Sequence, residues 1–347
     1  MSDASSLPAL IAWGLSIGGL LFGMWLLTRS ADWFVDGAVG LAFRLRMPPL
    51  IVGFVIVGFG TSAPEMLVSV LAAAQGLPLL SLGNAYGSNI TNVLLILGAS
   101  MLIAPIALHR VALRRDIPFL LLTTLFIVGL ALFGSLTRLH GAILVAAFIL
   151  FLAWQIFQAM KKREATPCEG AQEVAPLGRS LFLTLGGLGA LLAASQILVM
   201  SARFIAERAA AAAGMSPEAT QLIIGITVVA LGTSLPELMA SITAMRKGQH
   251  DIALGNVVGS NCFNLCIVAG LALLIHPVSE DTMPYAFRYR DGLIMLATTL
   301  TLWVGGLLAW LRVHGKKRDV TLGRKWGISF LVAWLLYTLW VFTHTAN

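Results

Sequence analysis

Charge is scarce in this chain. Only 11% of its 347 residues are Asp, Glu, Lys or Arg, whereas 58% are hydrophobic, and the mean hydropathy is +0.87. A soluble domain of this length needs more charge on its surface, so that class is excluded. Several apolar runs exceed the roughly 18 residues that cross a bilayer as a helix, and the short alternating segments of a transmembrane barrel are absent. The fold class predicted is an all-α polytopic membrane protein.

Cysteine is almost absent too, with Cys168, Cys262 and Cys266 as the only three. Cys262 and Cys266 lie four positions apart, but two thiols are too few for a closed zinc site, so packing is the simpler role. The chain has no nucleotide-binding loop, no metal-binding histidine pair and no nucleophile with a matching base. We therefore expect neither an enzyme nor a cofactor, and any transport must use an ion gradient or be passive.

Ten apolar segments are predicted as transmembrane helices. They are Leu7–Leu27, Leu50–Ala74, Leu79–Ala104, Ile117–Phe133, Gly141–Met160, Ser180–Met200, Gln221–Met245, Ile252–Ile275, Gly292–Leu311 and Trp326–Phe342. Helices 1 and 6 can run on past these limits. Their continuations, Ser30–Arg46 and Ser201–Ala213, carry scattered charge and are expected near a membrane interface.

Basic residues are spread unevenly over the connections. Those after helices 1, 3, 5, 7 and 9 hold 18 of the 23 Lys and Arg residues, and the opposite side holds 5. Because cytoplasmic loops are enriched in basic residues, both termini are predicted on the extracellular (periplasmic) side of a plasma or bacterial inner membrane. This asymmetry explains the net charge of +7 without a nucleic-acid partner. Lys316-Lys317-Arg318 could touch anionic membrane lipid, although a topology anchor is the simpler interpretation.

One polar motif occurs twice. Gly60-Thr61-Ser62-Ala63-Pro64-Glu65 recurs as Gly232-Thr233-Ser234-Leu235-Pro236-Glu237, 172 positions later. Downstream, the segment 83–92 recurs at 255–264 with the same offset, and residues 60–98 share 16 of 39 positions with 232–270. The identities are mostly polar or small residues, which a shared hydrophobic composition does not explain. The motif therefore marks an internal repeat.

The two copies of the motif lie five predicted helices apart. An odd separation reverses the direction across the membrane, so the halves are predicted to be inverted-topology repeats of five helices, with a site between them at the midplane. The domains are then residues 1–160 (helices 1–5) and 180–347 (helices 6–10). The polar segment 161–179 between them is predicted to be a cytoplasmic linker.

Oxygen-bearing side chains recur at helical spacing within the repeat. Thr61, Glu65 and Ser69 are four apart, as are Asn84, Ser88 and Asn92, and both rows return in the second half. Pro64 and Pro236 remove a helical hydrogen bond and free carbonyls one turn earlier. Freed backbone groups in a membrane need protein, water or an ion as a partner. The four rows of polar side chains, two from each half, are therefore predicted to face one common centre.

The donors in this centre are all oxygen atoms, which suit hard cations such as calcium and sodium. Two carboxylates would balance one divalent or two monovalent ions, and competition for them would produce exchange. Helix packing is the alternative to ion binding for the small polar residues. The two roles are evenly balanced for Ser69 and Ser241, whereas helix capping or packing beside the site is preferred for four asparagines. Those four are Asn84, Asn89, Asn256 and Asn261.

The paired motifs resemble those of the calcium/cation antiporter superfamily, most closely its bacterial sodium/calcium exchanger branch. The resemblance covers the ten-helix plan and implies residue roles. Glu65 and Glu237 would bind calcium directly, with backbone carbonyls from Thr61 and Thr233. Sodium would use these groups and the side chains of Ser62, Ser88, Asn92, Ser234, Ser260 and Asn264, with backbone oxygens of Gly58 and Ala230. Helices 1 and 6 would form a sliding pair that exposes the site to each side in turn.

Asn264 bears on the choice of ion. Potassium-dependent members of the resembled family carry Asp at this position, so Asn264 argues against a potassium requirement. The favoured hypothesis is a Ca²⁺/Na⁺ antiporter that works by alternating access, with a monomer sufficient for transport. The alternative is a proton-coupled antiporter of Ca²⁺ or another divalent cation with the same fold. A cation channel is less favoured, because channels more often build their filters from symmetric subunits.

Overall fold

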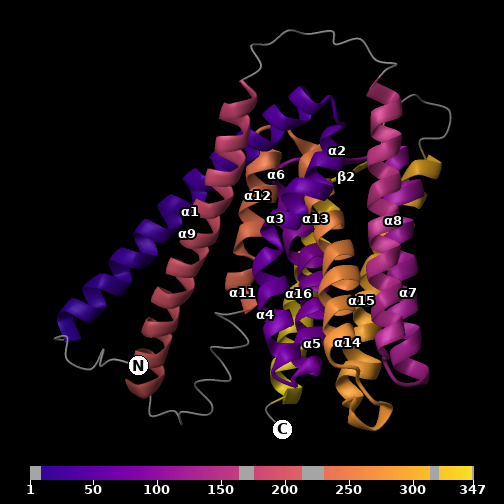
Figure 1. Ribbon diagram of the computed structural model, residues 1–347. Coiled ribbons are helices and arrows are strands. Elements are labelled where there is room, and N and C mark those ends of the chain that lie inside the picture. The colour runs from indigo at the N-terminus through magenta and orange to yellow at the C-terminus, as the bar shows by residue number, and fades with distance from the viewer. Residues whose placement is uncertain (1–8, 164–175, 213–229, 313–319, 346–347) are drawn as a thin grey trace.

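The structure is a computed structural model, and it describes residues 9–163, 176–212, 230–312 and 320–345. These parts are almost entirely helical (Figure 1). Seven helices are long and apolar enough to cross a membrane, or eight if the bent pair Pro49–Thr61 and Ala63–Ala74 forms one span. The chain is thus a multi-pass membrane protein. The predicted count of ten includes part of helix 7 (221–229) that lies outside the described residues.

The helices follow one another in an order that repeats. The first half contains α1 (Ala9–Leu45), α2 (Pro49–Val52), α3 (Gly58–Thr61), α4 (Ala63–Ala74), α5 (Pro78–Thr91), α6 (Gly98–Ile103), α7 (Ile117–Phe133) and α8 (Arg138–Arg163). The second half contains α9 (Leu177–Ala212), α11 (Ala230–Thr233), α12 (Leu235–Arg246), α13 (His250–Phe263), α14 (Ala269–Ile275), α15 (Gly292–Arg312) and α16 (Arg324–Thr345). Two three-residue strands, β1 (Ile106–Leu108) and β2 (Val320–Leu322), are also present, and short π-helical or 3₁₀ turns lie between several of the helices.

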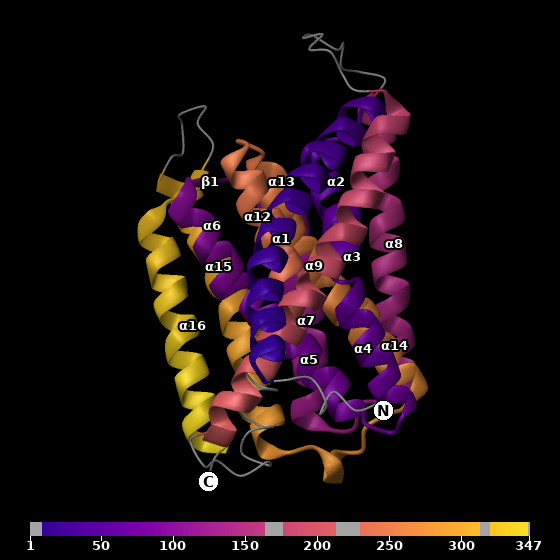
Figure 2. The same cartoon turned by 90° about the vertical axis from the view of Figure 1, so that its left-hand side faces the viewer.

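The two longest helices, α1 and α9, lie side by side and slant away from the other helices (Figures 1 and 2). Glycines allow close contact: a Cβ at Gly187 would lie 2.6 Å from the Phe34 nitrogen, and one at Gly37 would lie 2.8 Å from the Leu183 carbonyl carbon. The pairing predicted for helices 1 and 6 is therefore present. It leaves their outer faces exposed, as expected for helices that face lipid.

The two helices of this pair run on past Leu27 and Met200, as the sequence allowed. Helix 1 continues to Leu45, 37 residues or about 55 Å in all. The continuation Ser30–Arg46 contains charged residues, but its residues Ala31, Phe34 and Val35 are fully buried. Tertiary contacts thus bury part of a segment that was expected near a membrane interface.

The remaining helices pack closely where α2 and α3 meet α13. A Cβ at Gly259 would lie 2.7 Å from the Phe54 Cα, and one at Gly58 would lie 2.9 Å from the Ser260 nitrogen. Small residues such as these let helix backbones approach closely.

Tight turns and strand pairs join the helices at both ends of the molecule. Gly76 and Gly248, at matching positions of the repeat, have φ of 78° and 71°, which lets α4 turn into α5 and α12 into α13. β1 pairs antiparallel with β2 at the upper end in Figure 1. A second bridge, between Leu136 and Val278, ties the α7–α8 turn to the segment after α14 at the opposite end.

Candidate cation site

Each copy of the polar motif interrupts a helix. Ser62 separates α3 from α4 with φ/ψ of −86°/5°, and Ser234 separates α11 from α12 with −87°/−1°. The helices on the two sides of Ser62 differ in direction by 48°. Pro64 and Pro236 explain both breaks, because neither has an N–H to continue the hydrogen-bond ladder and each fits the first turn of a new helix. The spacing of Thr61, Glu65 and Ser69 had predicted one continuous helix. The break at Ser62 instead separates Thr61 from the other two residues.

Both acids lie in the first turn of the helix that follows the break. Glu65 is 1% exposed and Glu237 is 2% exposed, and no described Lys, Arg or His forms an ion pair with either. The helix N-terminus stabilises a carboxylate in this position. One carboxylate oxygen of each, Oε2, is buried without a hydrogen-bond partner among the described residues. Such oxygens have spare lone pairs for a cation.

The first break lies against the second acid. Ser62 Oγ donates a hydrogen bond to Glu237 Oε1 over 3.0 Å. Thr61 Oγ1 donates to the Val57 carbonyl over 3.0 Å and lies 3.2 Å from Asn256 Oδ1. The contacts of Ser62 with Glu237 and of Thr61 with Asn256 join residues roughly half the chain apart. One site therefore contains groups from both halves of the repeat.

Asn256 on α13 is the most connected side chain beside the acids. Its Nδ2 donates to Ser241 Oγ over 2.8 Å and to the Glu237 carbonyl over 3.2 Å. Its Oδ1 faces Thr61, so one buried amide links α3, α12 and α13. The matching residue of the first half, Asn84, makes only the counterpart bond to Ser69 Oγ, over 3.0 Å.

Removing the Asn256 amide should destabilise the fold more than removing its repeat counterpart. We expect Asn256→Ala to lower the free energy of unfolding by about 2 kcal/mol, because several buried partners lose a hydrogen bond. Asn84→Ala is the matched control and should cost less than half of that. Thermal unfolding in detergent, followed by tryptophan fluorescence, gives both values. Equal losses in the two variants would contradict the bridging role.

Other asparagines join α5 to α13. Asn92 Nδ2 donates to Asn261 Oδ1 over 2.9 Å, and Asn261 Nδ2 donates to the Asn89 carbonyl over 3.3 Å. Ser260 Oγ donates to the Gly58 carbonyl over 3.2 Å. Asn264 differs, since it is fully buried and neither its oxygen nor its nitrogen has a partner among the described residues. Its amide is free to contribute to a ligand site.

Asn92 and Asn264 each begin a π-helical turn, Asn92–Leu97 and Asn264–Val268. Such turns are rare inside α-helices and are frequent at functional sites, because the wider turn leaves carbonyls without their usual partner. The two turns start at matching positions of the repeat. The local backbone irregularity is thus duplicated together with the polar side chains.

The predicted ligand residues are placed as follows. Hydrogen bonds across the halves involve Gly58, Thr61, Ser62, Asn92, Glu237 and Ser260. Glu65, Ser88, Ser234 and Asn264 are buried, and Thr233 is half-buried. Ala230 begins α11, and the nine residues predicted to precede it in helix 7 lie outside the described part.

Three residues that make contacts at the site were not among the predicted ligands. Asn256 and Asn261 were expected to pack beside the site, and identity between the repeats was the signal that marked them. Ser195 on α9 donates to the Gly232 carbonyl over 2.6 Å, directly before the second break. The residue 172 positions earlier is Gly23, so the repeat contained no signal for Ser195.

The arrangement defines a helical membrane protein with a buried, oxygen-rich site whose two carboxylates come from two copies of one motif. Residues 15–157 and 180–343 match the family described as sodium/calcium exchanger protein. The chain belongs to that family, which is a family of transporters rather than of enzymes.

Three relatives illustrate the similarity. CaxA of Alkalimonas amylolytica is 41% identical over 330 residues, covering 93% of this chain and 98% of the relative. The inner membrane protein YrbG of Escherichia coli (strain K12) is 35% identical over 328 residues, covering 93% and 96%. Among solved structures, the sodium-calcium exchanger NCX_Mj matches with a TM-score of 0.74 and 28% identity, covering 93% of this chain and 98% of that one.

Proposed function

We propose that the protein is a secondary active antiporter that exchanges Ca²⁺ for Na⁺ by alternating access at the site between its halves. The observation that carries the proposal is the buried pair Glu65 and Glu237, which comes from two repeat copies and has no described cationic partner. A buried carboxylate without a compensating charge is costly in a membrane. A bound cation removes that cost, and each ion must then displace the other.

The architecture we propose has ten transmembrane helices in two inverted repeats. Counted this way, α2–α4, α5–α6, α11–α12 and α13–α14 are four broken spans, and the others are single helices. The strand pairs support inversion, since Ile106 and Val278 are 172 positions apart but form their pairs at opposite ends of the molecule. The start of α1 and the end of α16 lie at the same end, as an even number of spans requires (Figure 1).

The donor set favours calcium and sodium as the transported substrates. Carboxylate, hydroxyl, amide and backbone oxygens meet at the two breaks, and calcium takes six to eight oxygens with flexible geometry. The ligands we propose are the twelve predicted ones. They are Glu65 and Glu237 with Gly58, Thr61, Ser62, Ser88, Asn92, Ala230, Thr233, Ser234, Ser260 and Asn264. No cofactor is proposed.

Relatives support the same pair of ions. A relative in Methanosarcina acetivorans, 28% identical over 323 residues, is named sodium/calcium exchanger MaX1. The solved structures of the sodium-calcium exchanger NCX_Mj are described as soaked with Na⁺ and Ca²⁺ or Sr²⁺. From the basic-residue asymmetry we propose that both termini lie outside the plasma or inner membrane. We also propose that a monomer suffices, because a single chain contains both copies of the motif.

Proton coupling is the second candidate, because two carboxylates can carry protons when no metal is bound. Calcium uptake into proteoliposomes distinguishes the two. We expect an outward sodium gradient to drive uptake at least about tenfold above the rate without a gradient, while potassium and proton gradients give little. Uptake driven by a pH gradient without sodium would instead establish the proton-coupled alternative, and uptake with no gradient dependence would indicate a channel.

A further inference from the structure

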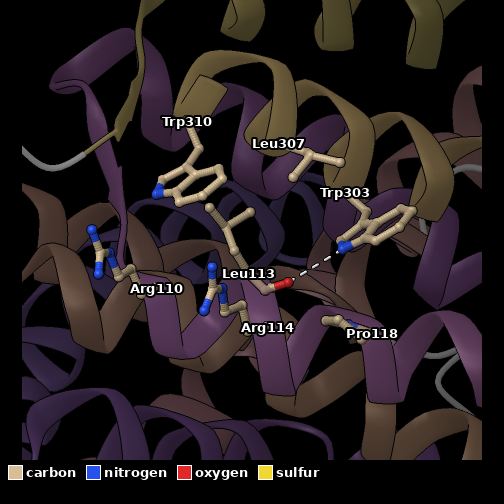
Figure 3. Close-up of a pocket in the computed structure, with 7 residues that line it drawn as sticks. All are labelled: Arg110, Leu113, Arg114, Pro118, Trp303, Leu307 and Trp310. Carbon is tan, nitrogen blue, oxygen red and sulfur yellow. Dashed lines mark hydrogen bonds between the residues drawn. The ribbon is translucent and has the colours of Figure 1, made fainter. Parts of the chain in front are cut away.

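We propose that the cavity between the start of α7 and the end of α15 binds the headgroup of an anionic phospholipid. The cavity has a volume of about 420 Å³, and its lining includes Arg110, Arg114, Trp303 and Trp310 (Figure 3). It is separate from the cation site, and the ion exchange proposed above does not use any of these residues. The proposal uses the predicted orientation of the chain in the membrane for one purpose, which is to assign the cavity to the cytoplasmic leaflet.

The two arginines provide an unneutralised charge. Arg110 and Arg114 are four residues apart, are exposed, and have no ion pair in the part of the chain that the structure describes. The next residue, Arg115, is different, because it is bound to Asp116 by two hydrogen bonds. The turn therefore contains one arginine whose charge is satisfied and two that can bind an external anion. A phosphate diester is a good ligand for guanidinium groups, which donate in a fixed fork.

Trp310 holds both guanidinium groups at the cavity. Its ring centre lies 5.3 Å from Arg114 Cζ and 6.0 Å from Arg110 Cζ, and Figure 3 shows the indole on the same side as both arginines. A guanidinium stacked on an indole keeps its N–H groups available in the ring plane. The stacking thus limits the conformational freedom of the two arginine side chains and leaves their N–H groups available to donate hydrogen bonds.

The depth and polarity of the cavity suit a phospholipid. Trp303 and Trp310 lie seven residues apart on α15, about 10 Å along the helix, and Trp310 is close to its end at Arg312. Tryptophan belongs at the headgroup level of a bilayer. Trp303 donates its indole N–H to the Leu113 carbonyl over 3.2 Å and, with Leu307, forms an apolar inner wall (Figure 3). The lining thus combines exposed charge, on Arg110 and Arg114, with half-buried apolar surface, on Trp303 and Leu307, as a phospholipid combines a charged headgroup with apolar chains.

The inverted repeat provides an internal comparison. The segment before α15 contains the same Arg-Asp pair, because Arg290 Nε binds Asp291 Oδ1 over 2.8 Å. Aligning it with Arg115-Asp116 places Tyr285 and Tyr289 at the positions of Arg110 and Arg114, and these tyrosines pack on each other with ring centres 4.8 Å apart. Of these two matching turns, only the one predicted to be cytoplasmic has described arginines without an ion pair, and anionic lipids give that side of the membrane a negative surface potential.

Quenching by brominated lipids tests the proposal on the purified full chain in neutral detergent. Brominated phosphatidylglycerol should quench tryptophan fluorescence with at least about tenfold higher apparent affinity than brominated phosphatidylcholine. The double variant Arg110→Gln/Arg114→Gln should remove this preference. Trp303→Phe/Trp310→Phe should remove most of the selective quenching, since it removes the tryptophans nearest the headgroup.

The matched control is Arg46→Gln/Arg246→Gln, which removes two positive charges from the same predicted side but outside the cavity. It should retain the preference. Equal affinity for the two lipids in the native chain, or equal loss in the control and cavity variants, would overturn the proposal. Competition by inorganic phosphate as effective as that by phosphatidylglycerol would show a phosphate site and not a lipid site. Binding is measured without ion flux, so the result is independent of the exchange activity.

Discussion

Replacing either Glu65 or Glu237 by glutamine is expected to reduce sodium-dependent calcium uptake by at least about 100-fold. Glutamine keeps the shape and one oxygen but removes the charge that compensates the cation. Breaking a buried charge pair costs about 3–5 kcal/mol, and each 1.4 kcal/mol is a factor of ten in affinity. Both acids are 2% exposed or less, so water cannot replace the lost charge. The measurement is ⁴⁵Ca²⁺ uptake into proteoliposomes under an imposed sodium gradient.

Glu207→Gln is the control for this pair of variants. Glu207 is exposed and binds Arg203 one turn away on α9, so its loss should leave uptake within about twofold of the native rate. Calcium-induced stabilisation provides a second readout that does not require transport, because a ligand that binds only the folded state raises the melting temperature. The glutamine variants should fold and lose this shift. Native uptake by Glu65→Gln or Glu237→Gln would contradict the proposed site.

Gly259→Val is expected to destabilise the protein severely, by about 4 kcal/mol or more. A Cβ at this position would overlap the Phe54 backbone on the neighbouring helix, with the Phe54 Cα only 2.7 Å away. Backbone atoms cannot rotate aside as a side chain can, so α13 would have to separate from the α2–α3 segment. That movement would also disturb the Thr61–Asn256 and Ser260–Gly58 contacts beside the acids.

Gly186→Val is the control. Gly186 lies on α9, is exposed, and no described atom lies within 4 Å of a Cβ there. Gly186→Val should therefore keep a melting temperature within a few degrees of the native protein, while Gly259→Val melts far earlier or fails to fold. Size-exclusion chromatography and thermal unfolding in detergent compare the two. Equal destabilisation would mean that the close contact of Gly259 with Phe54 is not the cause of the loss.

Much of the fold was predictable because the membrane simplifies the problem. Apolar runs of sufficient length must be helices, since the backbone has no water to bind in the bilayer. Irregular backbone near Pro64 and Pro236 was also predictable, since each proline removes a hydrogen-bond donor whatever surrounds it, but a full break between two helices was not predicted. The sequence allowed helices 1 and 6 to run on, but where they end depends on tertiary contacts such as that of Gly187 with Phe34.

The candidate site was predictable in its composition and not in its connections. Spacing and repetition selected Glu65, Glu237 and the polar residues beside them. Spacing did not indicate that Ser62 binds Glu237 or that Asn256 links three helices, since these contacts join residues 175 and 195 positions apart. Ser195 could not be found from the repeat, because the matching residue of the first half is Gly23. The cavity beside Trp310 could not be predicted either, because it depends on how α7 and α15 approach each other.

The sequence by itself determined that this protein is a helical membrane protein with two copies of an acidic, oxygen-rich motif, because length, polarity and proline act locally along the chain. Tertiary structure alone decided which copy meets which. Ser62 meets Glu237, and Thr61 meets Asn256, although these residues lie 175 and 195 positions apart. Two copies of one motif contain the same residues, so the local sequence cannot encode which partner each copy contacts. Those partners are set by how the two halves pack against each other.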